Sequence, residues 1–396
     1  MRRIYFDHSA TTPVHPLVAR EMDHFLTGDN FGNPSSMHYF GRIALNALDE
    51  AREKVARAIG ASTGEIIFTS SGTESDNMAI HGAAYTNRRR GNHIITSAVE
   101  HHAVLHTVRA LESHGFDVTI LPVDRYGMVD INDVEAAITD KTILISVMHA
   151  NNEVGTIMPI AEIGRLAQER RITFHVDAVQ SFGKIPVNVD DLGVNLLSLA
   201  GHKFYGPKGV GMLYVRKGTP WKQTMLYGGA QEHMRRAGTE NIPAIVGFGK
   251  AVELAVEKID EESKRLITLR DRMIKEVLDR FPHVELTGHP NLRLPNHVSF
   301  VFRYIEGESM LLSLDMRGIA VSSGSACTSG SLEPSHVLLS MGYPHEVAHG
   351  SLRLTLGKDN TEEDVEYFLD VMEPIVTRLR AMSPLMRNSD ANIPAE

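Results

Sequence analysis

Between residues 60 and 216, short apolar runs alternate with segments of helical periodicity, and this alternation strongly constrains the fold. The apolar runs cover residues 65–71, 93–98, 142–150, 172–178, 195–200 and 209–215. They are rich in β-branched residues, which is typical of strands buried on both faces. Helices are predicted between them, over residues 73–88, 101–115, 131–138 and 160–171. Strands and helices in alternation predict an α/β fold with a mainly parallel sheet and right-handed crossovers.

The length of the chain predicts a second, smaller domain. A chain of 396 residues exceeds the size at which one hydrophobic core usually stops growing. A charged helical region up to residue 281 leads into two further strands, 297–302 and 351–356, and a helix over 361–382. We expect a large domain of residues 13–250 and a small α+β domain of residues 1–12 and 251–396. The small domain would carry a loop at about residues 322–334.

Composition and charge exclude several classes of partner and location. The formal net charge of −9 argues against binding to nucleic acid or to an anionic membrane. Asp7 and His8 interrupt the apolar stretch that a signal peptide needs, and no apolar window reaches the length of a membrane span. Cys327 is the only cysteine, so the chain has no internal disulfide framework, which indicates a cytoplasmic protein.

Polar residues follow the predicted strands, at the edge where parallel sheets place their chemistry. Gly72 and Thr73 open a helix that can bind an anion, although a simple helix cap is the alternative. Asp177 ends an apolar strand and needs a cation or an N–H donor, for which an ordinary Arg or Lys is the alternative partner. Lys203 follows another buried strand, where desolvation would make its amine nucleophilic. His101 lies over the same edge, where a structural role is the alternative.

These four features, taken together in their order along the chain, predict one cofactor. A phosphate site, a carboxylate for a pyridinium nitrogen, a stacking imidazole and a Schiff-base lysine are what pyridoxal 5'-phosphate requires. The sequence His345-Glu346-Val347-Ala348-His349 matches a zinc-binding pattern, but Pro344 and Gly350 leave room for little more than one helical turn. We interpret this match as a coincidence and expect no intrinsic metal site.

Nine motifs along nearly the whole chain resemble those of one known family. They are YFDHSATTP, FGNPSS, FTSSGTESDN, TSAVEHHAV, MHANNEVG, HVDAVQS, GHKFYGPKGVG, RRAGTEN and SSGSACTSG. The sequence resembles a cysteine desulfurase of the class V aminotransferase group, a fold type I enzyme that depends on pyridoxal phosphate. The last motif resembles that of the long-loop (group I) branch, which supplies sulfur for iron–sulfur cluster assembly and nitrogenase maturation.

The resemblance implies a role for individual residues. Lys203 would bind the cofactor covalently and move the Cα proton, Asp177 would pair with the pyridine nitrogen, and His101 would stack on the ring and act as an acid–base group. The other implied contacts are Gln180 to the phenolic oxygen of the cofactor ring, Asn152 to the cofactor or the bound substrate, and Gly72, Thr73 and His202 to the cofactor phosphate. Thr239 would contact the phosphate in the other subunit of a homodimer, and Arg353, helped by Asn33, would bind the substrate carboxylate. Ala200 stands where members of the family usually carry Ser or another donor to the phosphate, which predicts a weaker hold on the cofactor.

The resemblance also assigns a function to the single cysteine. L-cysteine would become L-alanine, with sulfane sulfur left as a persulfide on Cys327 and passed to an iron–sulfur scaffold or another acceptor, including acceptors for thiolation. A loop rich in Ser and Gly would let this thiol move between the cofactor and the acceptor, and Cys327 would be at most a transient ligand of a shared iron–sulfur cluster. A selenocysteine lyase and a catalytically silent sulfur-relay or scaffold-binding protein are the alternative functions.

Overall fold

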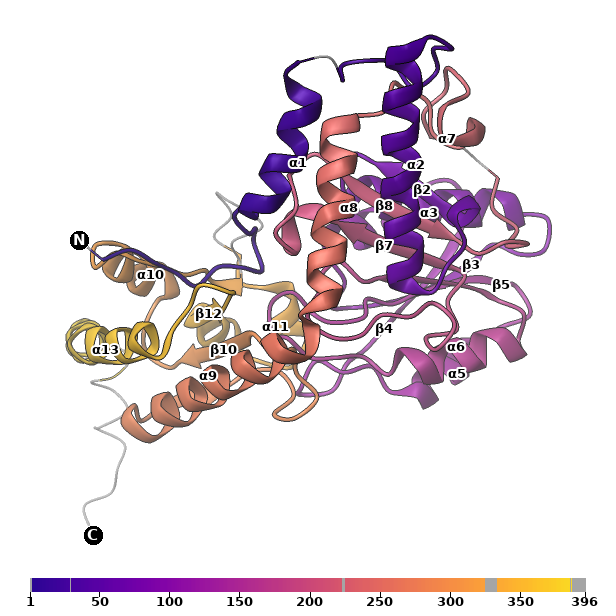
Figure 1. The fold of residues 1–396 in the computed structure, drawn as a ribbon. Helices are drawn as coiled ribbons and strands as arrows, with labels where there is room; N and C mark the ends of the chain where they lie inside the picture. Colours follow the sequence, from indigo (N-terminus) through magenta and orange to yellow (C-terminus); the bar gives the residue numbers. More distant parts are fainter. Residues whose placement is uncertain (1, 29, 223–224, 325–332, 385, 387–396) are drawn as a thin grey trace.

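The computed structural model describes residues 2–28, 30–222, 225–324, 333–384 and 386 (Figure 1). Cys327 lies outside these residues, as does most of the predicted loop around it. Among the described residues, every helix is too short or too polar to cross a lipid bilayer.

A seven-stranded sheet forms the centre of the larger part of the molecule (Figure 1). Its strand order is β2-β8-β7-β6-β5-β3-β4. The strands are β2 (Ile66–Thr69), β3 (His93–Ser97), β4 (Asp117–Leu121), β5 (Thr142–Ser146), β6 (Thr173–Asp177), β7 (Leu196–Ala200) and β8 (Gly211–Val215). Strands β4, β3, β5, β6 and β7 run parallel, and β8 is antiparallel to both β7 and β2. The prediction of a mainly parallel sheet is therefore confirmed.

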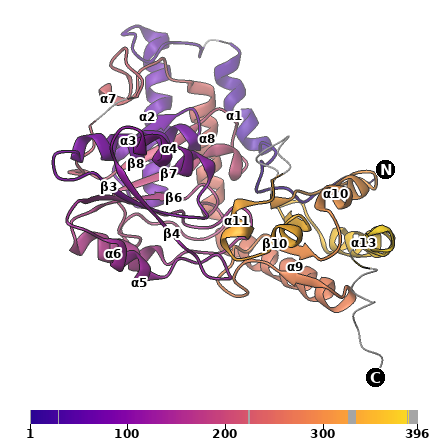
Figure 2. The same ribbon diagram turned by 180° about the vertical axis from the view of Figure 1, so that it is seen from behind.

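Helices cover both faces of this sheet, as the two opposite views show (Figures 1 and 2). On one face lie α2 (Tyr39–Ile59), α6 (Ile160–Glu169) and α8 (Ile242–Glu257), with α1 (Pro16–Leu26) beside α8 and α5 (Ile131–Ala137) beside α6. On the other face lie α3 (Gly72–Asn87) and α4 (His102–Glu112). Because side chains alternate along a strand, Ile66 packs in the first core and Ile67 in the second. Strands β2, β3, β5, β7 and β8 carry apolar residues on both faces, whereas β6 has Phe174 and Val176 on the first face and polar residues on the second.

Strand β4 is the element of the sheet that the apolar runs did not predict. It lies at the edge of the sheet, and most of its side chains are partly exposed. An edge strand does not need a continuous apolar run, so the signal that identified its neighbours is weak here.

A second hydrophobic core is built from both ends of the chain. Strands β9 (Val284–Leu286), β10 (His297–Phe302) and β12 (Ser351–Thr355) form an antiparallel sheet, and β1 (Ile4–Tyr5) pairs with β11 (Ile319–Ala320) in parallel. Helices α9 (Ile259–Arg280), α10 (Gly307–Asp315) and α13 (Glu362–Met382) complete this unit (Figure 1). Phe6 packs here with Phe300 and Phe368, all fully buried. The expected division into two domains rests on this separate core and stays a prediction.

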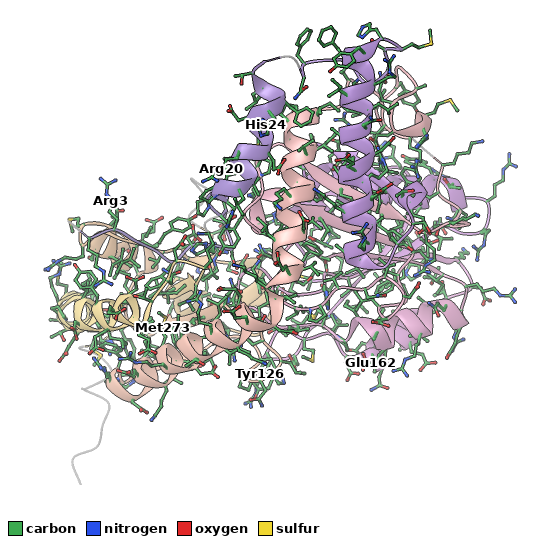
Figure 3. All side chains as sticks on the ribbon, in the orientation of Figure 1. Arg3, Arg20, His24, Tyr126, Glu162 and Met273 are labelled. Atoms are coloured by element: carbon green, nitrogen blue, oxygen red, sulfur yellow. The ribbon has the colours of Figure 1, made fainter. Side chains whose placement is uncertain are left out.

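Most of the charged side chains lie on the outer surface. Arg20 on α1 and Glu162 on α6 project into solvent, whereas Met273 on α9 is fully buried (Figure 3). The short elements η1 (Thr63–Glu65), η2 (Gly201–Lys203), α7 (Gln231–Met234), α11 (His336–Ser340) and α12 (His345–Ala348) connect the larger ones. Helix α12 carries most of the zinc-like pattern and is four residues long. Among the described residues, no group of three or more metal-ligating side chains could hold a metal ion.

Candidate active site

A cavity of about 370 Å³ lies at the carboxyl ends of β6 and β7. Open parallel sheets bind their ligands at this edge, because the loops after the strands converge there. The predicted residues that line the cavity are Gly72, Thr73, His101, Asn152, Asp177, Gln180, Ala200, His202, Lys203 and Arg353. The structure therefore brings together predicted residues as far as 281 positions apart, since Gly72 and Arg353 share one cavity.

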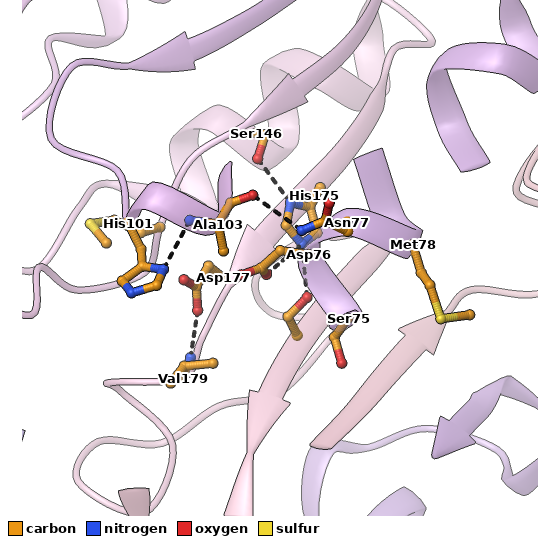
Figure 4. A network of polar contacts seen from close by, with 12 residues as sticks. Ser75, Asp76, Asn77, Met78, His101, Ala103, Ser146, His175, Asp177 and Val179 are labelled. Atoms are coloured by element: carbon orange, nitrogen blue, oxygen red, sulfur yellow. Dashed lines mark hydrogen bonds and ion pairs between the residues drawn. The ribbon is translucent and has the colours of Figure 1, made fainter. Parts of the chain in front are cut away.

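Asp177 is the last residue of β6, and its carboxylate is held at the floor of the cavity. Its Oδ1 accepts a hydrogen bond of 2.9 Å from the Val179 N–H, and the residue is only 6% exposed (Figure 4). Burial raises the pKa of Asp177 to about 6, against the opposing effects of the Val179 hydrogen bond and the Lys203 charge. A cationic N–H group bound in the cavity would offset this cost of burial.

Lys203 follows the neighbouring strand, β7, in the short helix η2. Its Nζ donates to the Ser9 carbonyl oxygen at 2.5 Å and to the Ala10 carbonyl oxygen at 2.8 Å. The N-terminal segment thus holds the amine at the cavity wall before any ligand is present. Ser9 and Ala10 also line the cavity, a contact that the sequence analysis did not predict.

His101 caps the N-terminus of α4 and is held in one orientation. Its Nδ1 accepts a hydrogen bond of 3.1 Å from the Ala103 N–H (Figure 4). Burial, followed by the positive charge of Lys203, lowers the pKa of His101 to about 4. The imidazole is therefore neutral near pH 7, and because Nδ1 accepts, its proton lies on Nε2.

The N-terminus of α3 forms the part of the cavity suited to an anion. A Cβ at Gly72 would lie 2.9 Å from Val179 Cγ2 and 3.2 Å from Ala200 Cβ, so only glycine lets the helix start approach so closely. The first amides of a helix have no partner within the helix, and the helix dipole favours a negative charge there. Ala200 adds no hydrogen-bond donor to this end.

His202 lies at the same end of the cavity, held by the N-terminal segment. Its Nδ1 lies 3.1 Å from Thr11 Oγ1, and its carbonyl oxygen accepts from the Thr12 N–H at 2.9 Å. Burial, together with the nearby Lys203 and Lys208, lowers the pKa of His202 to about 4. A neutral imidazole next to the start of α3 can donate one hydrogen bond to an anion.

Arg353 reaches the cavity from β12 of the second core. Its Nη1 donates to the Asn152 carbonyl oxygen and its Nη2 to Asp7 Oδ1, both at 3.0 Å. The residue is 3% exposed, and its Nε has no hydrogen-bond partner in the described structure. A buried guanidinium with an unused donor fits a carboxylate, which can accept two parallel hydrogen bonds.

A buried polar network lies behind Asp177, and the sequence analysis did not identify it. The His175 ring connects two hydroxyls, with Nδ1 2.8 Å from Ser146 Oγ and Nε2 3.0 Å from Ser198 Oγ (Figure 4). Its Nε2 also lies 3.6 Å from Asp76 Oδ1. Burial, and then the charge of Asp177, raises the pKa of Asp76 well above its usual value. Alternate polar positions in the strands were the available signal, since His175 lies two residues before Asp177 and so shares its face.

Two predicted residues do not line this cavity, and a third lies outside the described part of the structure. Asn33 and Thr239 are exposed and do not line it. Cys327 lies outside the described residues. Asp7, by contrast, lines the cavity although no role was predicted for it; its place in the YFDHSATTP motif was the available signal.

The family described as Aminotransferase class-V matches residues 4–368. The chain belongs to this family. The chain is 57% identical over 383 residues to "Cysteine desulfurase IscS" of Dictyoglomus turgidum, with 97% of each chain covered. It is 56% identical over 384 residues to the protein of the same name from Methanosarcina thermophila, covering 97% of this chain and 94% of that one. A solved "NIFS-LIKE PROTEIN" aligns with a TM-score of 0.89 and 40% identity, covering 95% of this chain and all of the other.

Members of the class-V family depend on pyridoxal 5'-phosphate and share fold type I, so the predicted family, fold and cofactor are confirmed. The cavity fits this cofactor. The Asp177 carboxylate can pair with a protonated ring nitrogen, and Lys203 supplies an amine. Gln180 Nε2 donates to the Ser9 carbonyl oxygen at 3.0 Å, and the buried Oε1 has no hydrogen-bond partner among the described residues. A hydroxyl of the bound ring would satisfy that oxygen.

Proposed function

We propose that this chain is a cysteine desulfurase that converts L-cysteine to L-alanine and retains sulfane sulfur as a persulfide on Cys327. The observation that carries the proposal is the convergence of Asp177, Lys203 and Arg353 on one cavity. Asp177 suits a pyridinium, Lys203 provides an amine, and Arg353 suits the carboxylate of an amino acid. The high identity to proteins named cysteine desulfurase supports L-cysteine as that amino acid.

Different residues would contact different parts of the cofactor. Pyridoxal phosphate, when bound to an amino acid, stabilises negative charge at Cα. Lys203 would hold it covalently through Nζ, Asp177 would keep its ring nitrogen protonated, and Gln180 and Asn152 would contact the ring. Gly72, Thr73 and His202 would hold the phosphate at the start of α3. These roles are proposals that rest on the positions of the side chains in the cavity.

The substrate would be oriented from the opposite side. Arg353 would bind the substrate carboxylate through its free Nε and a guanidinium edge, while Asp7 and Asn152 hold the guanidinium in place. We assign movement of the Cα proton to Lys203 Nζ. To accept that proton, Nζ would give up its hydrogen bonds to the Ser9 and Ala10 carbonyl oxygens. His101 would stack against the ring and donate from Nε2. Asn33 is exposed, and its contribution to substrate binding would require the other subunit or a movement of its segment.

Cys327 would take the sulfur. Its thiolate would attack the substrate sulfur, so that a sulfur–sulfur bond forms as the Cβ–sulfur bond breaks, and the three-carbon product leaves as alanine after protonation. No external oxidant is needed, because the substrate sulfur is oxidised from the thiol to the sulfane level while Cβ is reduced to the methyl group of alanine. The persulfide would then pass to an iron–sulfur scaffold or another acceptor protein.

We also infer a homodimer. Thr239 is exposed and lies outside the cavity of its own chain, which agrees with its assigned place at the phosphate in the other subunit.

The decisive experiment compares two substitutions in the cysteine motif. C327S should leave cofactor binding intact but reduce alanine formation from L-cysteine by two orders of magnitude or more, because a hydroxyl does not accept sulfane sulfur. S325A, in the same segment, should keep the activity. Alanine is quantified by chromatography and the persulfide by mass spectrometry of alkylated protein. Unchanged alanine formation by C327S would overturn the role of Cys327 and favour a lyase that uses no protein thiol.

A further inference from the structure

A second cavity of about 370 Å³ lies on the other side of η2, between the larger part of the molecule and the second core. Among the described residues, Lys203 alone lines both this cavity and the candidate active site. The walls come from the N-terminal segment, α8, the start of α9 and the residues after β12. Its volume falls within the range of small-molecule sites. We call it the rear cavity.

Much of the rear cavity is lined by aliphatic and aromatic side chains. These include Leu17, Leu254, Ala255, Ile259, Leu266 and Leu356. Such a wall favours a ligand with an apolar body, since removing apolar surface from water is favourable. Water alone would gain little here, because most of the wall offers it no hydrogen bond.

The charged groups of the rear cavity favour an anion. Lys184 is 9% exposed, and its Nζ donates to the Lys203 carbonyl oxygen at 3.2 Å. Lys258 and Lys358 also line the cavity. Glu262 is the acidic residue of the lining, and it is paired with Arg265 at 2.9 Å. Burial, and then the charge of Lys203, lowers the pKa of Lys184 to about 7, so a bound anion would restore its full positive charge.

Two buried polar atoms in the lining have no partner in the described structure. They are His8 Nδ1 and Asn296 Oδ1, in residues that are 4% and 2% exposed. Asn296 Nδ2 donates to the Leu356 carbonyl oxygen at 3.1 Å, so its Oδ1 is the atom left to accept. Leaving buried polar atoms unpaired is destabilising, because the loss of their hydrogen bonds to water is not compensated. A ligand that donates a hydrogen bond would satisfy Asn296 Oδ1.

We propose that the rear cavity binds a small hydroxy acid with an apolar body. The carboxylate would pair with Lys184, the hydroxyl would donate to Asn296 Oδ1 or meet His8 Nδ1, and the apolar body would pack against the leucines. A hydroxyl suits this site better than an ammonium group, because Lys184 and Lys258 repel a second cation, whereas Lys358 is paired with Asp359 at 2.6 Å. The inference does not depend on the reaction at the active site.

The test uses the holoenzyme with DL-phenyllactate as the probe. Calorimetric titration should show saturable binding, and the melting temperature should rise with probe concentration. The matched probe 3-phenylpropane-1,2-diol keeps the apolar body and the hydroxyl but lacks the carboxylate, and hydrocinnamate keeps the carboxylate but lacks the hydroxyl. Both should bind at least tenfold more weakly than phenyllactate, since each loses one of the two proposed polar contacts.

Two substitutions locate the bound probe. K184Q removes the buried cation and should weaken phenyllactate tenfold or more, whereas K141Q, at an exposed lysine far along the sheet, should not. A255L places a larger side chain in the cavity without altering charge and should abolish binding, which keeps the test decisive if K184Q does not fold. Equal binding to wild type and A255L would place the probe elsewhere, for example at Arg353, and would overturn the proposal. So would equal affinities for phenyllactate and the diol, or no binding at millimolar concentration.

Discussion

Arg353 Nη2 lies 3.0 Å from Asp7 Oδ1, although 346 positions separate the two residues in the chain. Asp7 comes from the segment after β1 and Arg353 from β12, and the pair lies at one end of the active-site cavity. Asn152 contributes its carbonyl oxygen from the larger part of the molecule. The guanidinium is therefore fixed by two other segments of the chain before a substrate arrives, and little side-chain entropy remains to be lost on binding.

We expect R353K to raise the KM for L-cysteine tenfold or more while lowering kcat less. A lysine ammonium does not make the two parallel hydrogen bonds that a carboxylate accepts from a guanidinium, and it does not keep the contacts with both Asp7 and Asn152. Steady-state alanine formation measures both constants. R303K is the control, because Arg303 pairs with Glu285 on the exposed side of the small sheet. A KM for R353K equal to that of R303K would remove Arg353 from the substrate site.

We expect A200S to slow the release of pyridoxal phosphate about tenfold and to leave the rate of persulfide formation nearly unchanged. The added hydroxyl would lie beside the start of α3, where Ala200 Cβ approaches Gly72. A hydrogen bond to a charged group is worth about 1.5–3 kcal/mol, which corresponds to tenfold or more in affinity. Dialysis against a carbonyl trap measures the release. If A200S and the wild type lose the cofactor at the same rate, another group already fills this position.

We expect cofactor binding to recover when T239A subunits are mixed with K203A subunits. In the mixed dimer, the site with an intact Lys203 would receive the intact Thr239 of its partner and would bind the cofactor as the wild type does. The second site would lack both groups. Absorbance of the bound cofactor and its dissociation rate report the recovery. If every mixed preparation keeps the weak binding of T239A alone, Thr239 acts within its own subunit.

We expect H149M to take up about one proton fewer than the wild type on unfolding at pH 5. His149 is 5% exposed, and burial lowers its pKa from 6.5 to about 4. Between those values the unfolded chain binds a proton that the folded chain does not, so this histidine makes the protein less stable as the pH falls from 6.5 to 4. The slope of the unfolding free energy against pH measures the difference.

The control for that substitution is H24M. His24 is exposed on α1, where water reaches it in the folded as well as the unfolded chain (Figure 3). A pH slope for H149M equal to that of H24M would show that His149 is protonated in the folded protein.

The residues at the strand ends could be predicted because a charged side chain beside a buried strand is costly unless it has a partner. Asp177 follows four buried residues in its strand. A carboxylate at such a position is costly unless a cation binds to it. Gly72, His101 and Lys203 could be placed beside it because parallel strands end at one edge. Arg353 was predicted from the family resemblance alone, since its strand belongs to another sheet and nothing local in the sequence points from that sheet to the cavity.

The features that escaped prediction depend on contacts between distant segments. Asp7 and the carbonyl groups of Ser9 and Ala10 act on Arg353 and Lys203, yet the local sequence is short and irregular. Strand β1 is two residues long and pairs with β11, so no periodic pattern could reveal it. The rear cavity likewise exists only where the N-terminal segment meets α8 and α9. Such contacts are set by tertiary packing, which single-sequence patterns do not contain.

The pairing of β1 with β11, and of Asp7 with Arg353, has a consequence for how the protein is made on the ribosome. The seven-stranded sheet is complete once residue 215 has been synthesised, but β1 must wait for residues 319 and 320, and Asp7 must wait for residue 353. During that interval the first ten residues, which later hold Lys203 and Arg353, have no partner strand. A nascent chain that ends before residue 353 therefore carries Asp177 and Lys203 of the cavity without Arg353, which we assign to the substrate carboxylate.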